Sequence, residues 1–193
     1  MSKARAKKIK LVLFDVDGVL TDGTIWLVPI APESVAGLAD SSSPGQIEVK
    51  GFHSHDGSGI SLARLGGLKT GVVTKRVSET VRLRARDLKM DYVLQGISNK
   101  RQAVEDILQK ESLRAEELAF VGDDVVDLPA MRACGLAIAV ANARKEVKAE
   151  AHIITEHAGG QGAARDAIEY ILRAQDKLDA AVAAYIDDRG PAK

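Results

Sequence analysis

Near its start the chain reads Leu11-Val12-Leu13-Phe14-Asp15-Val16-Asp17-Gly18-Val19-Leu20-Thr21. Four consecutive apolar residues predict a short strand that is buried on both faces, as in a parallel sheet. Two carboxylates, Asp15 and Asp17, follow this strand directly and precede a glycine. We therefore expect both carboxylates at the carboxyl end of the strand, which is where the sites of parallel α/β sheets form.

Similar apolar runs recur along the chain and predict further strands at 70–73, 92–94, 118–121, 136–140 and 153–154. Between them, apolar residues spaced by three and four positions predict helices at 58–66, 77–88, 99–111, 125–133 and 163–186. The alternation predicts an α/β fold, a Rossmann-like parallel sheet flanked by helices on both faces. We expect the longest helix, 163–186, to pack on this sheet, and a contact of that helix with another subunit is the alternative.

The segment 24–52 departs from the alternation and is interpreted as a β-hairpin insertion. Two strands, 24–28 and 46–49, flank a long loop over 29–45 that is rich in proline, glycine and serine. Residues 1–8 carry several basic residues and no acid, which is typical of a solvated tail. With 193 residues, the chain is expected to form a single domain over 1–193.

The composition narrows the functional classes. Lys and Arg total 27 and Asp and Glu total 27, so no net field favours nucleic acid or an anionic membrane surface. No apolar run approaches the roughly 18–20 residues that a membrane-spanning helix needs. A single cysteine, Cys134, excludes an internal disulfide. We therefore expect a cytoplasmic protein without a nucleic-acid or membrane partner.

A second acidic motif, Gly122-Asp123-Asp124-Val125-Val126-Asp127, directly follows another predicted strand. Parallel strands end at the same edge of a sheet, so these carboxylates are expected to converge with those of the first motif. Converging like charges raise one another's pKa, and a hard cation such as Mg²⁺ relieves the repulsion. Helix capping explains one Asp at each junction but not two such motifs. Thr74, at a strand end, and Lys100, at a helix start, would add a hydroxyl and an ammonium to this edge.

These residues resemble, in order, the four motifs of the haloacid dehalogenase-like (HAD) superfamily, namely Asp15-x-Asp17, Thr74, Lys100 and Gly122-Asp123-Asp124-x-x-Asp127. The resemblance runs from Ile9 to the end of the chain, except for the loop 29–45. It implies a member without a large cap domain, because 24–52 is too short for one. The hairpin is similar to hairpins through which family members form homotetramers.

Longer stretches are similar to the 3-deoxy-D-manno-octulosonate 8-phosphate (KDO 8-phosphate) phosphatase family. They are residues 15–23, 95–100, 121–129 and 159–163, together with Gln175-x-Lys177-Leu178. The resemblance implies a Mg²⁺-dependent phosphatase that hydrolyses KDO 8-phosphate to KDO and phosphate. The alternatives are a phosphatase of another acidic sugar phosphate, such as a nononate 9-phosphate, and a non-catalytic assembly subunit of the same fold.

The same resemblance implies the roles of the motif residues. Asp15 would be the nucleophile that forms an aspartyl-phosphate, and Asp17 would be the general acid and base. Asp15, the Asp17 backbone carbonyl and Asp123 would hold Mg²⁺, and Asp124 and Asp127 would support these ligands. Thr74 and Lys100 would hold the phosphoryl oxygens.

The implied substrate-binding residues are His55, Asp56, Gly57, Arg76, Arg84 and Lys100. Here the sequence departs from the family, which usually has Arg where His55 stands and a second basic residue where Ser61 stands. His53 and His55 alternate, so a shared metal site is an alternative to lining the mouth of the site. The segment 159–162 is interpreted either as a mobile closing segment or as the loop that starts the last helix.

Overall fold

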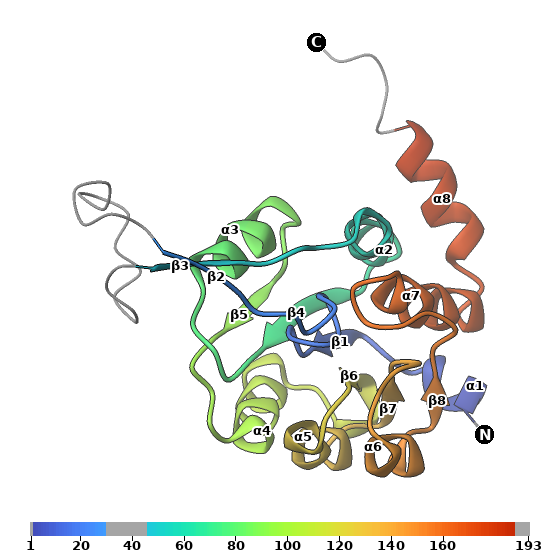
Figure 1. Ribbon diagram of the computed structural model, residues 1–193. Helices are drawn as coiled ribbons and strands as arrows, with labels where there is room; N and C mark the ends of the chain where they lie inside the picture. Colours follow the sequence, from blue (N-terminus) through green and yellow to red (C-terminus); the bar gives the residue numbers. More distant parts are fainter. Residues whose placement is uncertain (1, 30–45, 188–193) are drawn as a thin grey trace.

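The computed structural model describes residues 2–29 and 46–187, and its centre is a parallel sheet (Figure 1). The strand order is β5-β4-β1-β6-β7-β8, and every pairing between neighbours in this sheet is parallel. The strands are β1 (Leu11–Phe14), β4 (Lys69–Val73), β5 (Tyr92–Leu94), β6 (Leu118–Gly122), β7 (Leu136–Ala139) and β8 (Ile153–Ile154).

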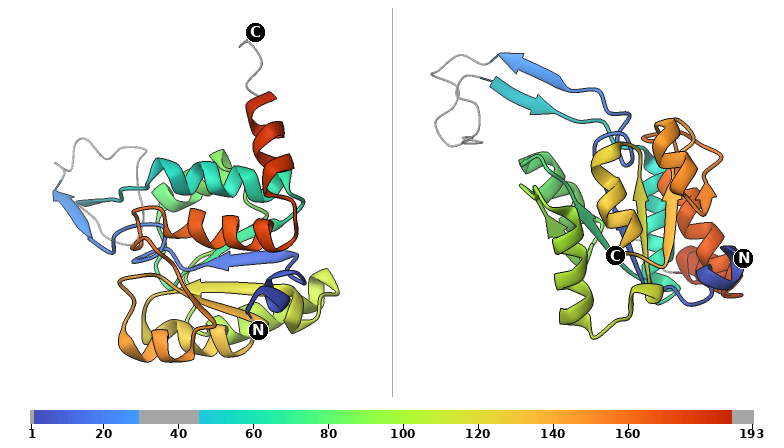
Figure 2. Two further views of the ribbon diagram at one scale, coloured as in Figure 1. Left: turned by 90° about the vertical axis from the view of Figure 1, so that its right-hand side faces the viewer. Right: turned by 90° about the horizontal axis from the view of Figure 1, so that it is seen from below.

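Helices cover both faces of the sheet (Figures 1 and 2). One face carries α2 (Ser54–Leu65), α3 (Glu79–Asp87) and α7 (Ala163–Ala174), and the other carries α4 (Lys100–Glu111), α5 (Leu128–Arg132) and α6 (Lys145–Glu150). α8 (Leu178–Asp187) packs on α2 and α7, and α1 (Ser2–Ala6) packs on α7. The predicted α/β fold is thereby confirmed. No helix in the described ranges is long and apolar enough to cross a membrane.

The core lies where the two central strands meet. β1 pairs with β6 in the register Leu13 with Phe120, and every residue of both strands is buried. Phe14 and Phe120 are among the largest fully buried side chains. Because both faces of these strands are covered by helices, a continuous apolar run is the pattern that fits them.

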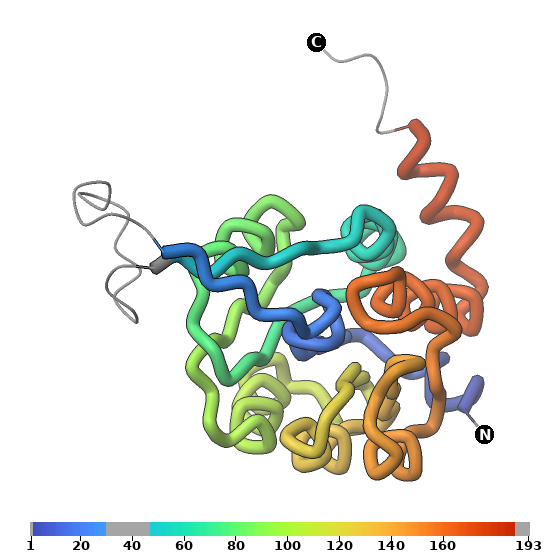
Figure 3. Tube along the Cα trace, viewed as in Figure 1, coloured from blue at the N-terminus to red at the C-terminus, as the bar shows by residue number. Residues whose placement is uncertain are grey.

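A two-stranded antiparallel sheet, β2 (Trp26–Pro29) and β3 (Gln46–Val49), forms the hairpin. It extends away from the helices and the main sheet (Figure 2), and the chain trace in Figure 3 shows its two strands leaving and rejoining the body on the same side. The first hairpin strand begins at Trp26, two residues later than expected from the sequence. Of the predicted loop 29–45, all but Pro29 lies outside the described residues.

The long helix predicted over 163–186 is instead two helices. Asp176 adopts a left-handed backbone conformation (φ +57°), and this ends α7. The Gln175 side chain then donates hydrogen bonds to the carbonyls of Ala6 (3.1 Å) and Ile9 (2.7 Å). Apolar periodicity continues across this break, which is why the pattern alone suggested a single helix.

Two short helices, α1 and α6, were not predicted from the sequence. The basic segment 1–8, expected as a solvated tail, contains α1, whose Ala6 is fully buried. Arg5 Nη1 anchors it by donating a hydrogen bond of 2.7 Å to the Gly135 carbonyl. α6 was not predicted, because it has six residues and buries only Val147, which is too little for a periodic pattern.

We predict that Gln175→Ala destabilises the fold by about 1–3 kcal/mol, because two partly buried carbonyls lose their donor. Urea unfolding followed by circular dichroism measures the change. Gln109→Ala, on the exposed face of α4, is the matched control and should stay within about 0.5 kcal/mol of the parent. Equal effects of the two substitutions would contradict this role of Gln175.

Candidate active site

Three parallel strands deliver the predicted motif residues to one edge of the sheet. Asp15 directly follows β1 and is aligned with β6 by its backbone N–H, which donates to the Val121 carbonyl at 3.0 Å. Thr74 follows β4, is buried, and is fixed by a backbone hydrogen bond of 2.9 Å to Leu94. Asp123 follows β6. The structure therefore brings these three residues to the same edge, as the sequence predicted.

Asp15, Asp123 and Asp127 form an acidic cluster in which one carboxylate oxygen of each lies within 4.8 Å of the others. Asp15 is buried and Asp127 is fully buried. Asp123 Oδ1 is buried and has no hydrogen-bond partner among the residues that the structure describes. Three carboxylates in so small a space repel one another, and a cation is needed to neutralise them.

Lys100 supplies one such charge. Its buried ammonium lies 2.8 Å from Asp15 Oδ1 and 2.7 Å from Asp127 Oδ1. Lys100 is the first residue of α4, and Asn99 caps this helix by accepting a hydrogen bond from the Gln102 backbone N–H. The start of the helix therefore fixes where the ammonium stands.

The electrostatics show that one lysine does not neutralise the cluster. Burial and the neighbouring Asp127 raise the pKa of Asp15 to about 6, against the opposing effect of Lys100. Burial, Asp127 and Asp15 raise the pKa of Asp123 to about 7. Burial acts to lower the pKa of Lys100, but Asp127 and Asp15 raise it above its usual value. The cluster therefore favours additional positive charge, either protons or a metal ion.

The two remaining aspartates of the second motif are engaged locally. Asp127 Oδ2 accepts hydrogen bonds from the backbone N–H groups of Asp123 (3.0 Å) and Asp124 (3.3 Å). The exposed Asp124 turns its carboxylate to the Val125 N–H at 2.7 Å, capping a short 3₁₀ turn. Asp127 thus holds the turn and Lys100 in place, while Asp124 lies outside the acidic cluster.

These residues fit a hard divalent cation. All the ligand atoms that they offer are carboxylate oxygens, which suit Mg²⁺. Asp127 already pairs with Lys100 and two amides, so Asp15 and Asp123 are the side chains that would hold the ion. His53 and His55 are not part of this cluster, and their rings contact each other edge to face.

The turn that contains Gly18 packs closely against Asp123 of the acidic cluster. Gly18 has φ +90°, and a Cβ there would lie 2.2 Å from Asp123 Oδ2. A Cβ on Gly159 would lie 1.7 Å from the Gly18 carbonyl oxygen, and Gly160 N–H donates to the Val19 carbonyl at 2.9 Å. The segment 159–162 therefore packs on the turn of the first motif and leads into α7.

Asp17 is not a member of the acidic cluster and pairs with a separate set of charges. Its Oδ1 accepts a hydrogen bond from Lys50 Nζ, and its Oδ2 lies 3.9 Å from Arg76 Nε. Lys50 and Arg76 both also pair with Glu48 of β3. Burial acts to raise the pKa of Glu48, but Arg76 and Lys50 lower it below its usual value. We call Asp17, Glu48, Lys50 and Arg76 the charge network.

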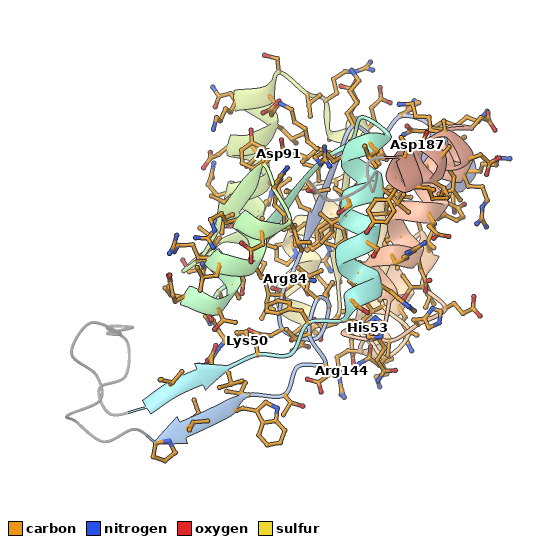
Figure 4. The ribbon with its side chains drawn as sticks, turned by 90° about the horizontal axis from the view of Figure 1, so that it is seen from above. Lys50, His53, Arg84, Asp91, Arg144 and Asp187 are labelled. Atoms are coloured by element: carbon orange, nitrogen blue, oxygen red, sulfur yellow. The ribbon has the colours of Figure 1, made fainter. Side chains whose placement is uncertain are left out.

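Sequence reasoning missed Glu48 and Lys50. A signal was present, because Glu48 and Lys50 stand at alternate positions of a predicted strand end and therefore share a face. Figure 4 shows Lys50 at the base of the hairpin, where β3 returns to the body.

The predicted substrate-binding residues are dispersed. Arg76 belongs to the charge network, whereas Asp56 is buried and its Oδ1 accepts a hydrogen bond of 3.1 Å from the Arg165 N–H at the start of α7. Arg84 lies between α3 and α2 (Figure 4), over the Phe52 ring and against Gly57. Asp56 thus links α2 to the start of α7, and Arg84 packs between α3 and α2.

His55 lies apart from the acidic cluster, on the rim of a neighbouring cavity. It is exposed and lines a cavity of about 600 Å³ beside α7, together with His157, Arg165 and Tyr170. None of the acidic-cluster residues lines this cavity. A ligand that reaches from the cluster to His55 would extend toward the start of α7.

Comparison with known sequences shows the family to which the chain is similar. Residues 84–168 match the family model for haloacid dehalogenase-like hydrolases. The chain is 37% identical over 178 residues to the 3-deoxy-D-manno-octulosonate 8-phosphate phosphatase of Escherichia coli K12. That match covers 92% of this chain and 87% of the relative.

Solved structures show the same fold. The phosphatase of that name from Moraxella catarrhalis, in complex with a magnesium ion, a phosphate ion and KDO, superposes with a TM-score of 0.83 at 34% identity, covering 95% of this chain and 97% of that one. The cobalt-bound form from Haemophilus influenzae gives 0.78 at 35% identity, covering 90% and 93%. The chain belongs to the haloacid dehalogenase-like hydrolases and, within them, to the family of the 3-deoxy-D-manno-octulosonate 8-phosphate phosphatases.

Proposed function

We propose that this protein is a Mg²⁺-dependent phosphatase that hydrolyses KDO 8-phosphate to KDO and phosphate through an aspartyl-phosphate. The observation that carries the proposal is the acidic cluster with its buried Lys100, set at the carboxyl ends of three strands. The Moraxella catarrhalis relative, which holds magnesium, phosphate and KDO, supports the substrate class.

Asp15 is the proposed nucleophile. Its Oδ1 accepts hydrogen bonds from the Val16 N–H (2.7 Å) and lies 2.8 Å from Lys100 Nζ, which leaves Oδ2 to attack phosphorus. Lys100 and the Thr74 hydroxyl would hold the oxygens of the transferred phosphoryl group. Mg²⁺ held by Asp15, the Asp17 backbone carbonyl and Asp123 would neutralise the repulsion between phosphate and carboxylates.

Asp17 is the proposed acid and base. The leaving group is a sugar alkoxide, which departs poorly without a proton, so a carboxylic acid beside it lowers the barrier. Asp17 then takes a proton from the water that attacks the aspartyl-phosphate. Its position two residues beyond the nucleophile places it on the same edge of the sheet while its carboxylate faces the charge network.

The acidic end of the sugar needs a cationic or hydrogen-bonding partner. The proposed partners are Arg76 and His55. Arg76 belongs to the charge network and has a half-exposed side chain, and His55 lines the cavity beside α7. His55 in place of the family's Arg favours one alternative, a different acidic sugar phosphate such as a nononate 9-phosphate.

We predict that purified protein releases phosphate from KDO 8-phosphate only with Mg²⁺, and that Asp15→Asn lowers kcat by at least about 1,000-fold because the nucleophile is lost. Phosphate release from a panel of sugar phosphates measures this. Asp106→Asn, an exposed aspartate on α4, is the matched control and should retain activity.

Each outcome of this panel assigns a function. Preferential turnover of another acidic sugar phosphate would keep the mechanism and replace the substrate. If no ester is hydrolysed although Mg²⁺ binds, the phosphatase proposal fails and the assembly-subunit alternative takes its place.

The raised pKa values of Asp15 and Asp123 predict a pH-dependent response to Mg²⁺. The pKa of Asp15 is raised from 3.8 to about 6 and that of Asp123 from 3.8 to about 7, so the folded protein binds protons more tightly than the unfolded chain. Without metal, the stability that these protons contribute is present below about pH 4. It is lost as the pH rises through about 6 and 7. Mg²⁺ binds the deprotonated carboxylates. The rise in Tm on adding Mg²⁺ should therefore be larger at about pH 8 than at about pH 5.5, as measured by calorimetry.

The matched variant is Asp123→Asn, which should show a smaller rise in Tm with Mg²⁺ at about pH 8. Equal Mg²⁺ effects at the two pH values in the parent protein would contradict the assignment of Asp15 and Asp123 as the residues that hold the ion.

We also propose a homotetramer assembled through the hairpin, in the cytoplasm. The supporting observation is the exposure of consecutive apolar side chains on the hairpin, with Trp26 62% and Leu27 52% exposed. Such a patch is typical of a protein–protein contact. A chain with one cysteine and no possible internal disulfide suits a reducing compartment.

We predict that Trp26→Glu dissociates the assembly, because a charge would be buried in an apolar contact. Light scattering after gel filtration measures the mass. Ile186→Glu tests α8, the other candidate contact, whose Ile186 is 63% exposed. Loss of the assembly in Ile186→Glu but not in Trp26→Glu would place the contact on α8 instead.

A further inference from the structure

The charge network joins three separate segments of the chain beside the acidic cluster. Asp17 comes from the turn after β1, Glu48 and Lys50 from the end of the hairpin, and Arg76 from the loop after β4. Lys50 contacts Asp17 and Glu48, and Arg76 contacts the same two carboxylates. Two cations and two carboxylates thus alternate, with no net charge.

Lys50 is the most enclosed member of this network. Its side chain is 1% exposed, against 43% for Arg76. A buried ammonium is stable only where carboxylates surround it, and here its Nζ lies against Asp17 Oδ1 and 3.0 Å from Glu48 Oε1. Lysine is seldom this buried, so its place beside Asp17 calls for an explanation.

We propose that Lys50 is a positioning residue that fixes the carboxylate of Asp17 for its two proton transfers, and that Glu48 holds Lys50 in place. This inference rests on the proposed phosphatase function. Lys50 is not itself a catalytic residue, because it acts through Asp17.

The geometry assigns different tasks to the two oxygens of Asp17. Oδ1 is held by Lys50, whereas Oδ2 lies 3.9 Å from Arg76 Nε, beyond hydrogen-bond distance. Oδ2 is therefore the oxygen that exchanges protons. It gives its proton to the ester oxygen as the phosphorus–oxygen bond of the ester breaks and the electron pair passes to that oxygen. It later takes a proton from the water that attacks phosphorus, while the bond between phosphorus and the Asp15 oxygen breaks and returns the carboxylate.

A role of Lys50 in binding the substrate fits the structure less well. To reach an anionic ligand, the ammonium would have to leave both Asp17 and Glu48, whose charges it neutralises while buried. Arg76 is the exposed cation of the network and is better placed for that task.

The test compares Lys50→Met with Lys50→Arg in single-turnover release of the leaving group, so that hydrolysis of the aspartyl-phosphate does not contribute. Two substrates are used, KDO 8-phosphate, whose alkoxide needs a proton, and p-nitrophenyl phosphate, whose phenolate leaves without one. Lys69→Met is the matched control, because Lys69 forms an exposed ion pair with Glu111 at the other end of β4.

We expect Lys50→Met to slow sugar release by about 30- to 100-fold, within the range of general acid catalysis, and to change p-nitrophenolate release by less than about 3-fold. KM should stay within about 3-fold. Lys50→Arg should recover most of the rate, and Lys69→Met should match the parent on both substrates.

Three results would overturn the inference: equal losses on the two substrates, no loss on either, or a rise in KM alone, which would make Lys50 a substrate-binding residue. If the parent protein does not hydrolyse the sugar ester, the proposed function fails instead. If Lys50→Met does not fold, Glu48→Gln takes its place, because it removes a charged partner of Lys50 and leaves the lysine in the chain. We expect Glu48→Gln to slow sugar release selectively, by a smaller factor than Lys50→Met. An equal loss on both substrates would again refute the proposal.

Discussion

The repulsion among buried carboxylates at the carboxyl edge of the sheet is the constraint on which the rest of the site depends. Two like charges 4 Å apart repel by about 4 kcal/mol at an effective dielectric constant near 20, and a domain is stable by only about 5–15 kcal/mol. Asp15, Asp123 and Asp127 therefore require positive charge in a fixed place. Lys100 supplies part of it, and the raised pKa values of Asp15 and Asp123 show that the remainder is unmet. The folded chain therefore favours additional positive charge at this edge, and a divalent cation would supply it at pH values where the carboxylates are ionised.

The surrounding fold keeps the repelling carboxylates and Lys100 close together. Parallel pairing of β1 and β6 aligns Asp15 with the end of its neighbour, and the start of α4 fixes Lys100. Gly18 lets the turn approach Asp123 more closely than any side chain would allow, and Gly159 packs on that turn. The same closeness that raises the electrostatic energy gives the site a fixed arrangement of charge before substrate arrives, which is the basis of electrostatic catalysis.

The strands and the position of the site could be predicted from the sequence, because both depend on short stretches of consecutive residues. Continuous apolar runs located the strands, and the acidic motifs directly after them located the site. What could not be read depends on contacts between distant segments. The chain turns between α7 and α8 at Asp176, beside Gln175, whose side chain reaches carbonyls near the N-terminus. Asp56, whose role in substrate binding stays a prediction, accepts a hydrogen bond from the start of α7. Neither contact leaves a periodic pattern, so only the folded structure reveals them.

The hairpin links the proposed assembly contact to the residue proposed for proton transfer. It leaves the body shortly after Asp17 and returns through Glu48 and Lys50, so both ends of this excursion meet in the charge network. The exposed apolar side chains of its outer part suit the proposed contact with another subunit, and its base is held by the charge network. Four alternating charges fix the base, and the carboxylate proposed for proton transfer is one of them. Any displacement of the base would move Lys50 relative to Asp17, so the placement of the hairpin and the orientation of the proposed acid are coupled.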